Sequence, residues 1–248
     1  MTDTMNELAA RQWKDYRTRQ PGTCFAGPGP GLDLPQAYEL QKAVAALRVA
    51  EGDSVIGYKV GCTGAGTVQQ FGMEGPIRGQ LFESEIRRSG VTLEAKDFAQ
   101  LAIEGEMAFR IGDDGGIAVA FPIIELHNFV FRGARKTLVE LVANNGLNAG
   151  VVLPEEPWFL PLSAIPGTAE MSVRVNGDLR GSGTLWPFDE GPSGSLDWLM
   201  RHLGDHQVDL SPGQIVLAGT PLGLYPVEPG DHVTVHIDGK LAVESRVN

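Results

Sequence analysis

The sequence predicts a mixed α and β (α+β) protein, and three observations support this prediction. Few helix breakers occur over Asn6–Arg19, so the N-terminal part has helical character. Glycine is abundant, with 32 residues, which favours short strands joined by turns. The dipeptides at 176–177 (NG) and 238–239 (DG) follow alternating apolar residues, as in two-residue hairpins. We therefore expect a helical N-terminal region ahead of a body rich in antiparallel strands.

A second helix is expected after the loop at 27–31 (GPGPG). Asp33 is a good N-cap residue, and Pro35 suits the first helical turn. Apolar residues then recur at spacings of three and four, as one buried helix face requires. These residues are Ala37, Leu40, Val44 and Leu47.

The body alternates predicted strands with two further helices. Val55–Val60 and Ala102–Ile111 are predicted strands, and Phe131–Val142 returns to helical spacing. Ser195 is expected to cap a short helix with one apolar face, formed by Leu196, Leu199 and Leu203. The predicted hairpins span Met171–Arg180 and Asp231–Val247. We expect a helical α/β region over residues 1–75 and a β-rich body over 76–248, in one continuous fold unit.

Composition limits the classes of partner. The 248 residues include 42% hydrophobic residues, enough for a sizeable core, and the net charge is −11. A strongly acidic chain is unsuited to nucleic acid or anionic membranes, because phosphate binding needs clustered Lys and Arg. No apolar run is long enough to span a bilayer, and residues 1–10 lack an apolar signal core. With two cysteines that do not form a disulfide framework, we expect a cytoplasmic protein with a small-molecule partner.

A pair of glutamates is the most informative local feature. Glu104 and Glu106 are two positions apart in a predicted strand, so their side chains share one face. Ile103, Met107 and Phe109 point to the other face and are candidate core residues. Two carboxylates on one face repel each other unless a cation or a shared proton neutralises them. An all-oxygen cluster suits Mg²⁺ or Mn²⁺ better than zinc.

Glu125 is a plausible third ligand. It lies in an otherwise apolar segment, 121–126 (FPIIEL), where an unpaired carboxylate would be costly to bury. The alternative is a solvated strand face with ordinary glutamates, because pairs with this spacing are common. The positions alone leave both interpretations open.

Several motifs, taken together, resemble the fumarylacetoacetate hydrolase superfamily. Within it, the chain is most similar to the branch of the 2-keto-4-pentenoate hydratases and 4-oxalocrotonate decarboxylases. The motifs run in order over most of the chain. They are LPQAYELQ (34–41), GYKVG (57–61), GQLF (79–82), IEGE (103–106), Glu125, NN (144–145), VNG (175–177) and PGQIVLAGT (212–220).

The resemblance implies a fold, a cofactor and an assembly. The expected fold is a mixed β-roll or sandwich of twisted sheets with a smaller N-terminal α/β region. The expected cofactor is Mg²⁺ or Mn²⁺, held by Glu104, Glu106 and Glu125. The family commonly forms homo-oligomers, so at least a dimer is expected.

The resemblance also implies a reaction class. The metal would chelate the 2-oxo group and a carboxylate oxygen of the substrate and stabilise an enolate. Lys59 matches the lysine of the GYKVG motif, where it would hold the substrate carboxylate or, with a depressed pKa, move protons. Without the resemblance, Lys59 would be interpreted as a surface lysine at a strand end. The expected enzyme is a hydratase of a 2-hydroxydienoate, with a 2-oxo acid decarboxylase as the alternative.

Departures from the family pattern separate the possible reactions. The hydrolases of the superfamily usually carry a histidine near the N-terminus, but no histidine precedes His127, which demotes a C–C bond hydrolase. Hydratases of this branch tend to carry an acid where this chain has Ile77, in the segment PIRG (76–79). An apolar residue there is more typical of the decarboxylases. Glu74, Glu83 or Glu85 could replace the missing acid, and Glu83 is our candidate.

The remaining candidate residues have weaker support. His127 shares a face with Glu125 if the segment is extended, and could orient a ligand or transfer a proton. Arg78 and Thr220 could bind substrate carboxylates, and Ser182 with its neighbour Gly183 could do similar work. Each has a plain structural alternative. A binding protein without turnover is a further possibility, because an intact metal site does not require the hydratase acid.

Overall fold

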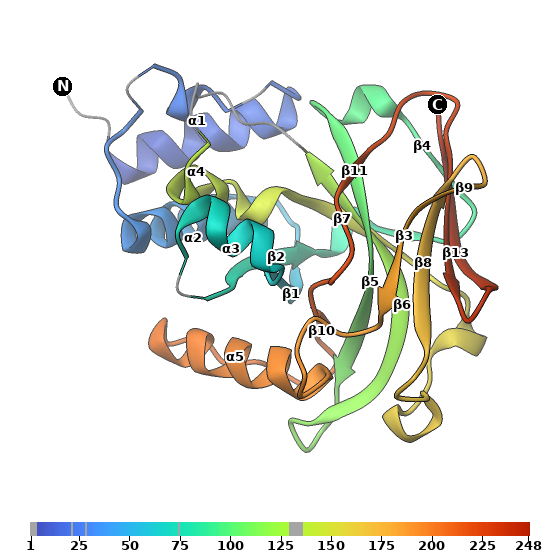
Figure 1. Cartoon of the computed structure of the whole chain (residues 1–248). Helices are drawn as coiled ribbons and strands as arrows, with labels where there is room; N and C mark the ends of the chain where they lie inside the picture. Colours follow the sequence, from blue (N-terminus) through green and yellow to red (C-terminus); the bar gives the residue numbers. More distant parts are fainter. Residues whose placement is uncertain (1–3, 21, 28, 74, 129–135) are drawn as a thin grey trace.

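The N-terminal region is helical as predicted. The computed structural model describes residues 4–20, 22–27, 29–73, 75–128 and 136–248 (Figure 1). Helix α1 spans Met5–Arg17 and α2 spans Leu34–Ala50. The predicted cap of α2 is confirmed, since the Asp33 carboxylate accepts a hydrogen bond from the Gln36 backbone in a capping box.

Two sheets make up the body. In the larger sheet the strand order is β2-β1-β10-β5-β6-β7-β3, with β11 paired to β5, and in the smaller it is β4-β13-β12-β8-β9. Figure 1 shows the larger sheet between the N-terminal helices and the smaller sheet. The larger sheet contains β1 (Val55–Gly61), β2 (Ile77–Phe82), β3 (Ile86–Arg88), β5 (Leu101–Ile111), β6 (Ile117–Asn128), β7 (Asn148–Leu153), β10 (Ile215–Leu217) and β11 (Tyr225–Pro226). The smaller contains β4 (Val91–Leu93), β8 (Glu170–Val175), β9 (Asp178–Thr184), β12 (His232–Ile237) and β13 (Lys240–Val247).

Shorter helices connect these strands. The α-helices are α3 (Ala65–Phe71), α4 (Leu138–Ala143) and α5 (Pro192–Asp205). Single 3₁₀ turns are η1 (Thr23–Phe25), η2 (Glu83–Glu85), η3 (Ala95–Asp97), η4 (Asn145–Leu147), η5 (Glu156–Trp158) and η6 (Leu162–Ala164). None of the helices in the described ranges is long and apolar enough to cross a membrane.

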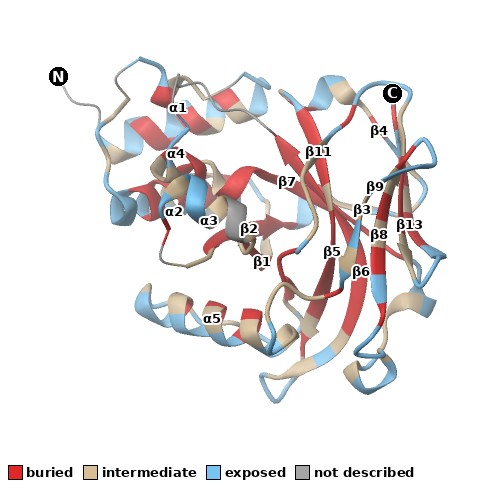
Figure 2. Cartoon of the chain, viewed as in Figure 1, coloured by how far each residue is buried: buried red, intermediate tan, exposed pale blue. Residues whose placement is uncertain are grey.

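The main core lies where the two sheets face each other. Ile103, Met107 and Phe109 of β5 are buried there, as predicted, with residues of β8 and β12 (Figure 2). Gly105 lets the sheets approach, because a Cβ at this position would lie 2.5 Å from Cγ2 of Val173. The core therefore fixes the opposite face of β5, which carries Glu104 and Glu106.

The mixed α+β class and both hairpins are confirmed. Asn176 and Gly177 have φ of 55° and 85°, and Asp238 and Gly239 have 48° and 77°, as a two-residue turn with two left-handed positions requires. The boundary expected at residue 75 stays a prediction. β1 lies before it and β2 after it, and the two strands pair within the larger sheet.

Two helix predictions are corrected. Of the helix expected over Phe131–Val142, residues 131–135 lie outside the described residues, and α4 begins at Leu138 after its cap Thr137. Ser195 is not a cap but lies within α5, where its hydroxyl donates to the Ala218 carbonyl at 2.7 Å. That bond ties α5 to the segment after β10, so the polar residue serves a tertiary contact rather than a helix end.

Candidate metal centre and active site

The pairing of β5 with β6 brings the predicted carboxylates together. Glu104 lies directly opposite Glu125 in the antiparallel register. Glu106 and His127 are each two residues further along their strands, so all four side chains start from one face of the sheet. The spacing argument made for β5 therefore extends to β6.

Glu125 is the most heavily hydrogen-bonded member of this group. Its Oε1 accepts from Lys59 Nζ and from Asn148 Nδ2, both at 2.7 Å. Its Oε2 lies 3.3 Å from His127 Nε2, which is also 3.1 Å from Glu104 Oε2. Burial raises the pKa of Glu125, but the charges of His127 and Lys59 outweigh this and lower it to about 2. Glu125 is therefore a carboxylate anion at neutral pH.

Glu106 is in the opposite situation. Its side chain is 1% exposed, and its Oε1 is buried without a hydrogen-bond partner. Burial, followed by the nearby negative charges of Glu125 and Glu104, raises the pKa of Glu106 well above its ordinary value. Three carboxylates face one lysine and one histidine, so the cluster cannot keep all three carboxylates ionised without a further cation.

A divalent cation fits this donor set. Ligand atoms of Glu104, Glu125 and His127 all lie within 4.8 Å of one another. The unpartnered oxygen of Glu106 adds a further donor on the same face. A cation would neutralise the excess charge, and carboxylate oxygens are the ligands that Mg²⁺ and Mn²⁺ prefer. The geometry adds His127 to the candidate ligands, a residue considered above only for orientation or proton transfer.

Lys59 reaches this cluster from β1. The residue is 3% exposed, and Nζ also donates to the Gly146 carbonyl at 3.1 Å. Burial lowers the pKa of Lys59, but Glu125 and Glu104 reverse this and raise it above the ordinary value. Lys59 is therefore an ammonium group here, in contrast to the depressed pKa considered from the sequence.

The cluster opens into a cavity of about 360 Å³, within the range of small-molecule sites. Glu104, Glu106, His127 and Lys59 all line it, together with Thr220. The Thr220 hydroxyl donates to the Gly105 carbonyl at 2.8 Å and accepts from the Leu222 backbone at 3.1 Å. Thr220 thus fixes the cavity wall beside the carboxylates.

Three candidate residues, Arg78, Glu83 and Ser182, are not among the residues that line this cavity. Glu83 and Ser182 are exposed, in η2 and β9. Arg78 is buried but belongs to a different cavity. The sequence analysis chose Arg78 because it lies next to the GQLF motif. The motif alone does not show that strand alternation directs the Arg78 side chain to the face opposite Lys59.

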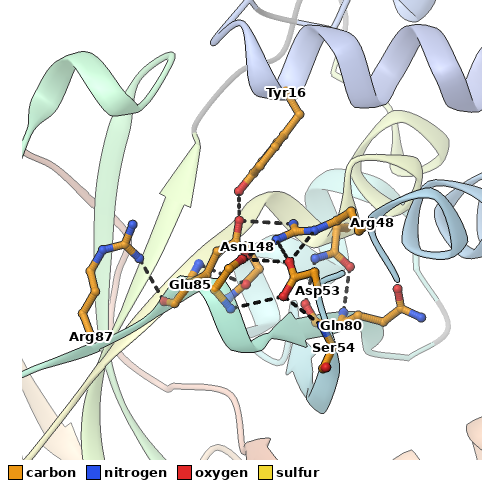
Figure 3. Close-up of polar contacts among 11 residues, drawn as sticks. Tyr16, Arg48, Asp53, Ser54, Gln80, Glu85, Arg87 and Asn148 are labelled. Carbon is orange, nitrogen blue, oxygen red and sulfur yellow. Dashed lines mark hydrogen bonds and ion pairs between the residues drawn. The ribbon is translucent and has the colours of Figure 1, made fainter. Parts of the chain in front are cut away.

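Two other residues were possible substitutes for the missing acid. Glu74 lies outside the described residues, and Glu85 is not among the residues that line the cavity. Glu85 is buried, but it pairs with Arg48 at 3.1 Å and accepts a hydrogen bond from Tyr16 (Figure 3). Ile77 and Lys59 both flank Gly61 and Gly146, so an apolar side chain occupies the space beside the lysine.

The sequence interpretation missed three contributors to the site. Asn148 was not singled out, although its amide holds Glu125. The Gly146 carbonyl accepts a hydrogen bond from Lys59. Gly146 has a φ of 60°, and the glycine that follows Asn144 and Asn145 in the sequence was a signal for this left-handed conformation. Cys62 lines the cavity, and burial raises the pKa of its thiol to about 11, so it is not a thiolate at neutral pH.

Comparisons with known proteins agree with the motifs. Residues 134–248 match the family model described as fumarylacetoacetate (FAA) hydrolase C-terminal. The 2-hydroxyhexa-2,4-dienoate hydratase of Comamonas testosteroni is 26% identical over 224 residues, which cover 85% of this chain and 84% of that protein. The 2-keto-4-pentenoate hydratase of Paraburkholderia xenovorans is 25% identical and the alignment covers 96% and 93%. The 4-oxalocrotonate decarboxylase of Pseudomonas sp. strain CF600 is 22% identical and the alignment covers 88% and 86%.

A solved structure shares the fold over nearly the whole chain. The 4-oxalocrotonate decarboxylase from Pseudomonas putida G7, complexed with magnesium and adipate, has a TM-score of 0.90 at 19% identity. The superposition covers 98% of this chain and 97% of that one. The same enzyme was also solved with calcium and acetate. The predicted fold and the family resemblance are confirmed. The magnesium and calcium in the related structures support a divalent metal but do not identify the ion.

Proposed function

Because this chain carries the fumarylacetoacetate hydrolase C-terminal domain, and its named relatives are lyases, we propose that it is a divalent-metal-dependent lyase of a small 2-oxo acid. The favoured reaction is hydration of a 2-hydroxydienoate to a 4-hydroxy-2-oxo acid. The single observation that carries the proposal is the cluster of three glutamates, two of them buried and two of them lining a cavity that Lys59 also lines. Three carboxyl groups brought together without enough cations to ionise them all destabilise a fold, which supports a role in binding a cation.

Glu104, Glu106 and Glu125 would hold the metal, with His127 as a further ligand or as the group that orients Glu104 and Glu125. Mg²⁺ is the favoured ion, given the carboxylate donors. When bound, it supplies an electrophile that stabilises negative charge developing on the 2-oxo oxygen.

The chain's own residues provide binding and proton handling. Lys59, held as an ammonium, would bind the substrate carboxylate and offer a proton to the dienolate carbon. Its fixed position follows from its bonds to Glu125 and Gly146. Thr220 would keep the wall in place through its two backbone hydrogen bonds.

A decarboxylase is the second candidate, favoured by Ile77. Loss of CO₂ gives the same stabilised dienolate and needs no acid to activate water. Hydration does need a group that positions or deprotonates water, and an apolar side chain lies beside Lys59. A homo-oligomer and a cytoplasmic location remain parts of the proposal, based on the family resemblance and on the two cysteines, which are free.

The test is a product analysis with Mg²⁺ present. A 2-hydroxypentadienoate-type substrate should give a 4-hydroxy-2-oxo acid, and Glu104→Gln should remove this activity. Release of CO₂ from a 2-hydroxymuconate-type substrate would instead assign the decarboxylase. Tight binding of both compounds without any product would reject the enzyme and leave a binding protein.

A further inference from the structure

A second polar cavity lies on the other face of the β1–β2 pair. Lys59 lies opposite Gly79 in this pair and packs its side chain against it. Arg78 is the neighbouring residue of β2, so it leaves the strand from the opposite face. It lines a cavity of about 180 Å³ that shares none of its lining residues with the metal cavity.

The Arg78 guanidinium is buried without a counter-ion. Arg78 is 4% exposed, and its Nε is buried without a hydrogen-bond partner. Within the described chain, no carboxylate forms an ion pair with Arg78. Its close neighbours are instead the rings of Tyr38 and Tyr58, at 5.2 and 5.9 Å from the guanidinium carbon. Buried arginines are normally paired, so this one calls for an anion.

Further nitrogen groups surround the same position. Figure 1 shows α5 running past the β1–β2 pair, and it brings His202 and its cap residue His206 against Tyr38, at ring distances of 4.8 and 5.0 Å. Nε2 of His202 is also buried without a partner. The exposed Lys42 lines the cavity, as does one exposed carboxylate, Glu39.

These contacts have an electrostatic signature. Burial, followed by the charge of Arg78, lowers the pKa of His202 to about 4 and also lowers that of His206. Both imidazoles are therefore neutral at pH 7, and each ring nitrogen that carries a proton is a hydrogen-bond donor. The cavity thus combines one unpaired guanidinium, an exposed ammonium and the neutral imidazole of His206, with His202 packed against Tyr38 beside it, which is the chemistry of an oxyanion site.

We propose that this cavity binds a small oxyanion, a carboxylate or a phosphate, with Arg78 as its central ligand, His206 and Lys42 on its wall, and His202 in contact with His206. The site is separate from the proposed catalytic cavity and does not depend on the metal.

The test is NMR of the histidine Cε1–H signals in the full chain, titrated at pH 7 with inorganic phosphate and, separately, with acetate. Chloride keeps the ionic strength constant. At least one anion should shift the His202 and His206 signals saturably, while those of His232 and His236 stay unchanged. The anion with the lower dissociation constant shows whether the cavity prefers a phosphate or a carboxylate. No saturable shift with either anion would overturn the proposal.

Variants locate the binding to Arg78. Arg78→Met removes the charge with little change in volume. It should raise the dissociation constant of the anion by about 10-fold or more, as expected for the loss of a charged hydrogen-bond donor. Arg201→Gln, an exposed change on α5, is the matched control and should bind normally. Glu106→Gln should leave anion binding unchanged, which separates this site from the metal centre. If Arg78→Met does not fold, Arg78→Lys replaces it and should bind more weakly than the unaltered chain. Equal affinity in the Arg78 variant and the control would contradict the proposal.

Discussion

Two clusters of charged side chains lie in this molecule, and they differ in the number of carboxylates that they bring together and in the size of the cavity beside them. In the first, Arg48 lies between Asp53 at 2.8 Å and Glu85 at 3.1 Å, with its guanidinium 3.5 Å from the Phe82 ring centre (Figure 3). In the second, Glu104, Glu106 and Glu125 face Lys59 and His127 beside a 360 Å³ cavity. Each cluster keeps one buried carboxylate oxygen without a hydrogen-bond partner, Glu85 Oε2 and Glu106 Oε1. The Arg48 cluster, however, holds its two carboxylates on one guanidinium beside a cavity of about 60 Å³, whereas three carboxylates converge in the glutamate cluster beside the much larger cavity. The difference indicates that the first stabilises the fold and the second is built for a ligand.

The largest expected effect is on stability, from the Arg48 cluster. Arg48→Met would leave the buried Glu85 and the half-buried Asp53 without their cation. We expect the free energy of unfolding to fall by about 3–5 kcal/mol, as when one partner of a buried ion pair is removed. Urea denaturation measures this change. A loss below about 1 kcal/mol would show that water pairs these carboxylates equally well.

The glutamate cluster should respond in the opposite way. Glu106→Gln removes a carboxyl group that two neighbouring carboxylates and burial disfavour as an anion. We expect kcat/KM to fall by about 100-fold or more, with no loss of stability in metal-free buffer. Activity assays and denaturation in a chelator measure the two quantities. If Glu106→Gln lost much of its stability and kept its activity, the glutamate cluster would be a stabilising cluster and the assignment of the two clusters would be wrong.

The scaffold of the glutamate cluster can be tested at Gly105. A Cβ there would lie 2.5 Å from Val173 Cγ2 and 3.1 Å from Val235 Cγ2. Gly105→Ala should therefore destabilise the fold by about 1–3 kcal/mol, as overpacking does, and should weaken metal binding by moving Glu104 and Glu106. Gly90→Ala, in the turn between β3 and β4, lacks such neighbours and tests backbone strain alone. Equal metal affinity in both variants would show that the site does not depend on this sheet contact.

The smallest expected effect concerns pH. His202 has a folded pKa of about 4, below its ordinary value of 6.5, so the unfolded chain binds a proton more readily between these values. Its contribution to stability is complete above about pH 6.5 and declines as pH falls towards 4. His202→Gln should therefore flatten the fall in melting temperature between pH 7 and pH 5. His232→Gln is the control for loss of a histidine, and identical slopes in both variants would contradict this origin.

Much of the local structure was predictable from the sequence. Hairpin turns, the Asp33 cap and the face alternation of β5 depend on neighbouring residues, and these predictions were confirmed. The approach of Glu104 to Glu125 depends on the register of β5 with β6, which periodicity does not specify. The family motifs supplied that information indirectly.

Failures of the sequence interpretation share one physical reason. Arg78 and Glu83 directly flank the GQLF motif (79–82), but the directions of their side chains depend on strand alternation and on where β2 ends. Asn148 and Gly146 belong to a different element from the residues they hold, and only packing brings them to Glu125 and Lys59. Contacts between distant segments are therefore what the sequence could not provide.

Metal binding by the glutamate cluster is the central claim, and an electron paramagnetic resonance titration with Mn²⁺ tests it most directly. The full chain should bind Mn²⁺ at a single site, and Mg²⁺ should compete for it. Glu104→Gln should lose this binding while its circular dichroism spectrum stays unchanged. If Glu104→Gln binds Mn²⁺ as tightly as the unaltered chain, or the unaltered chain binds none, the assignment of the metal centre is contradicted.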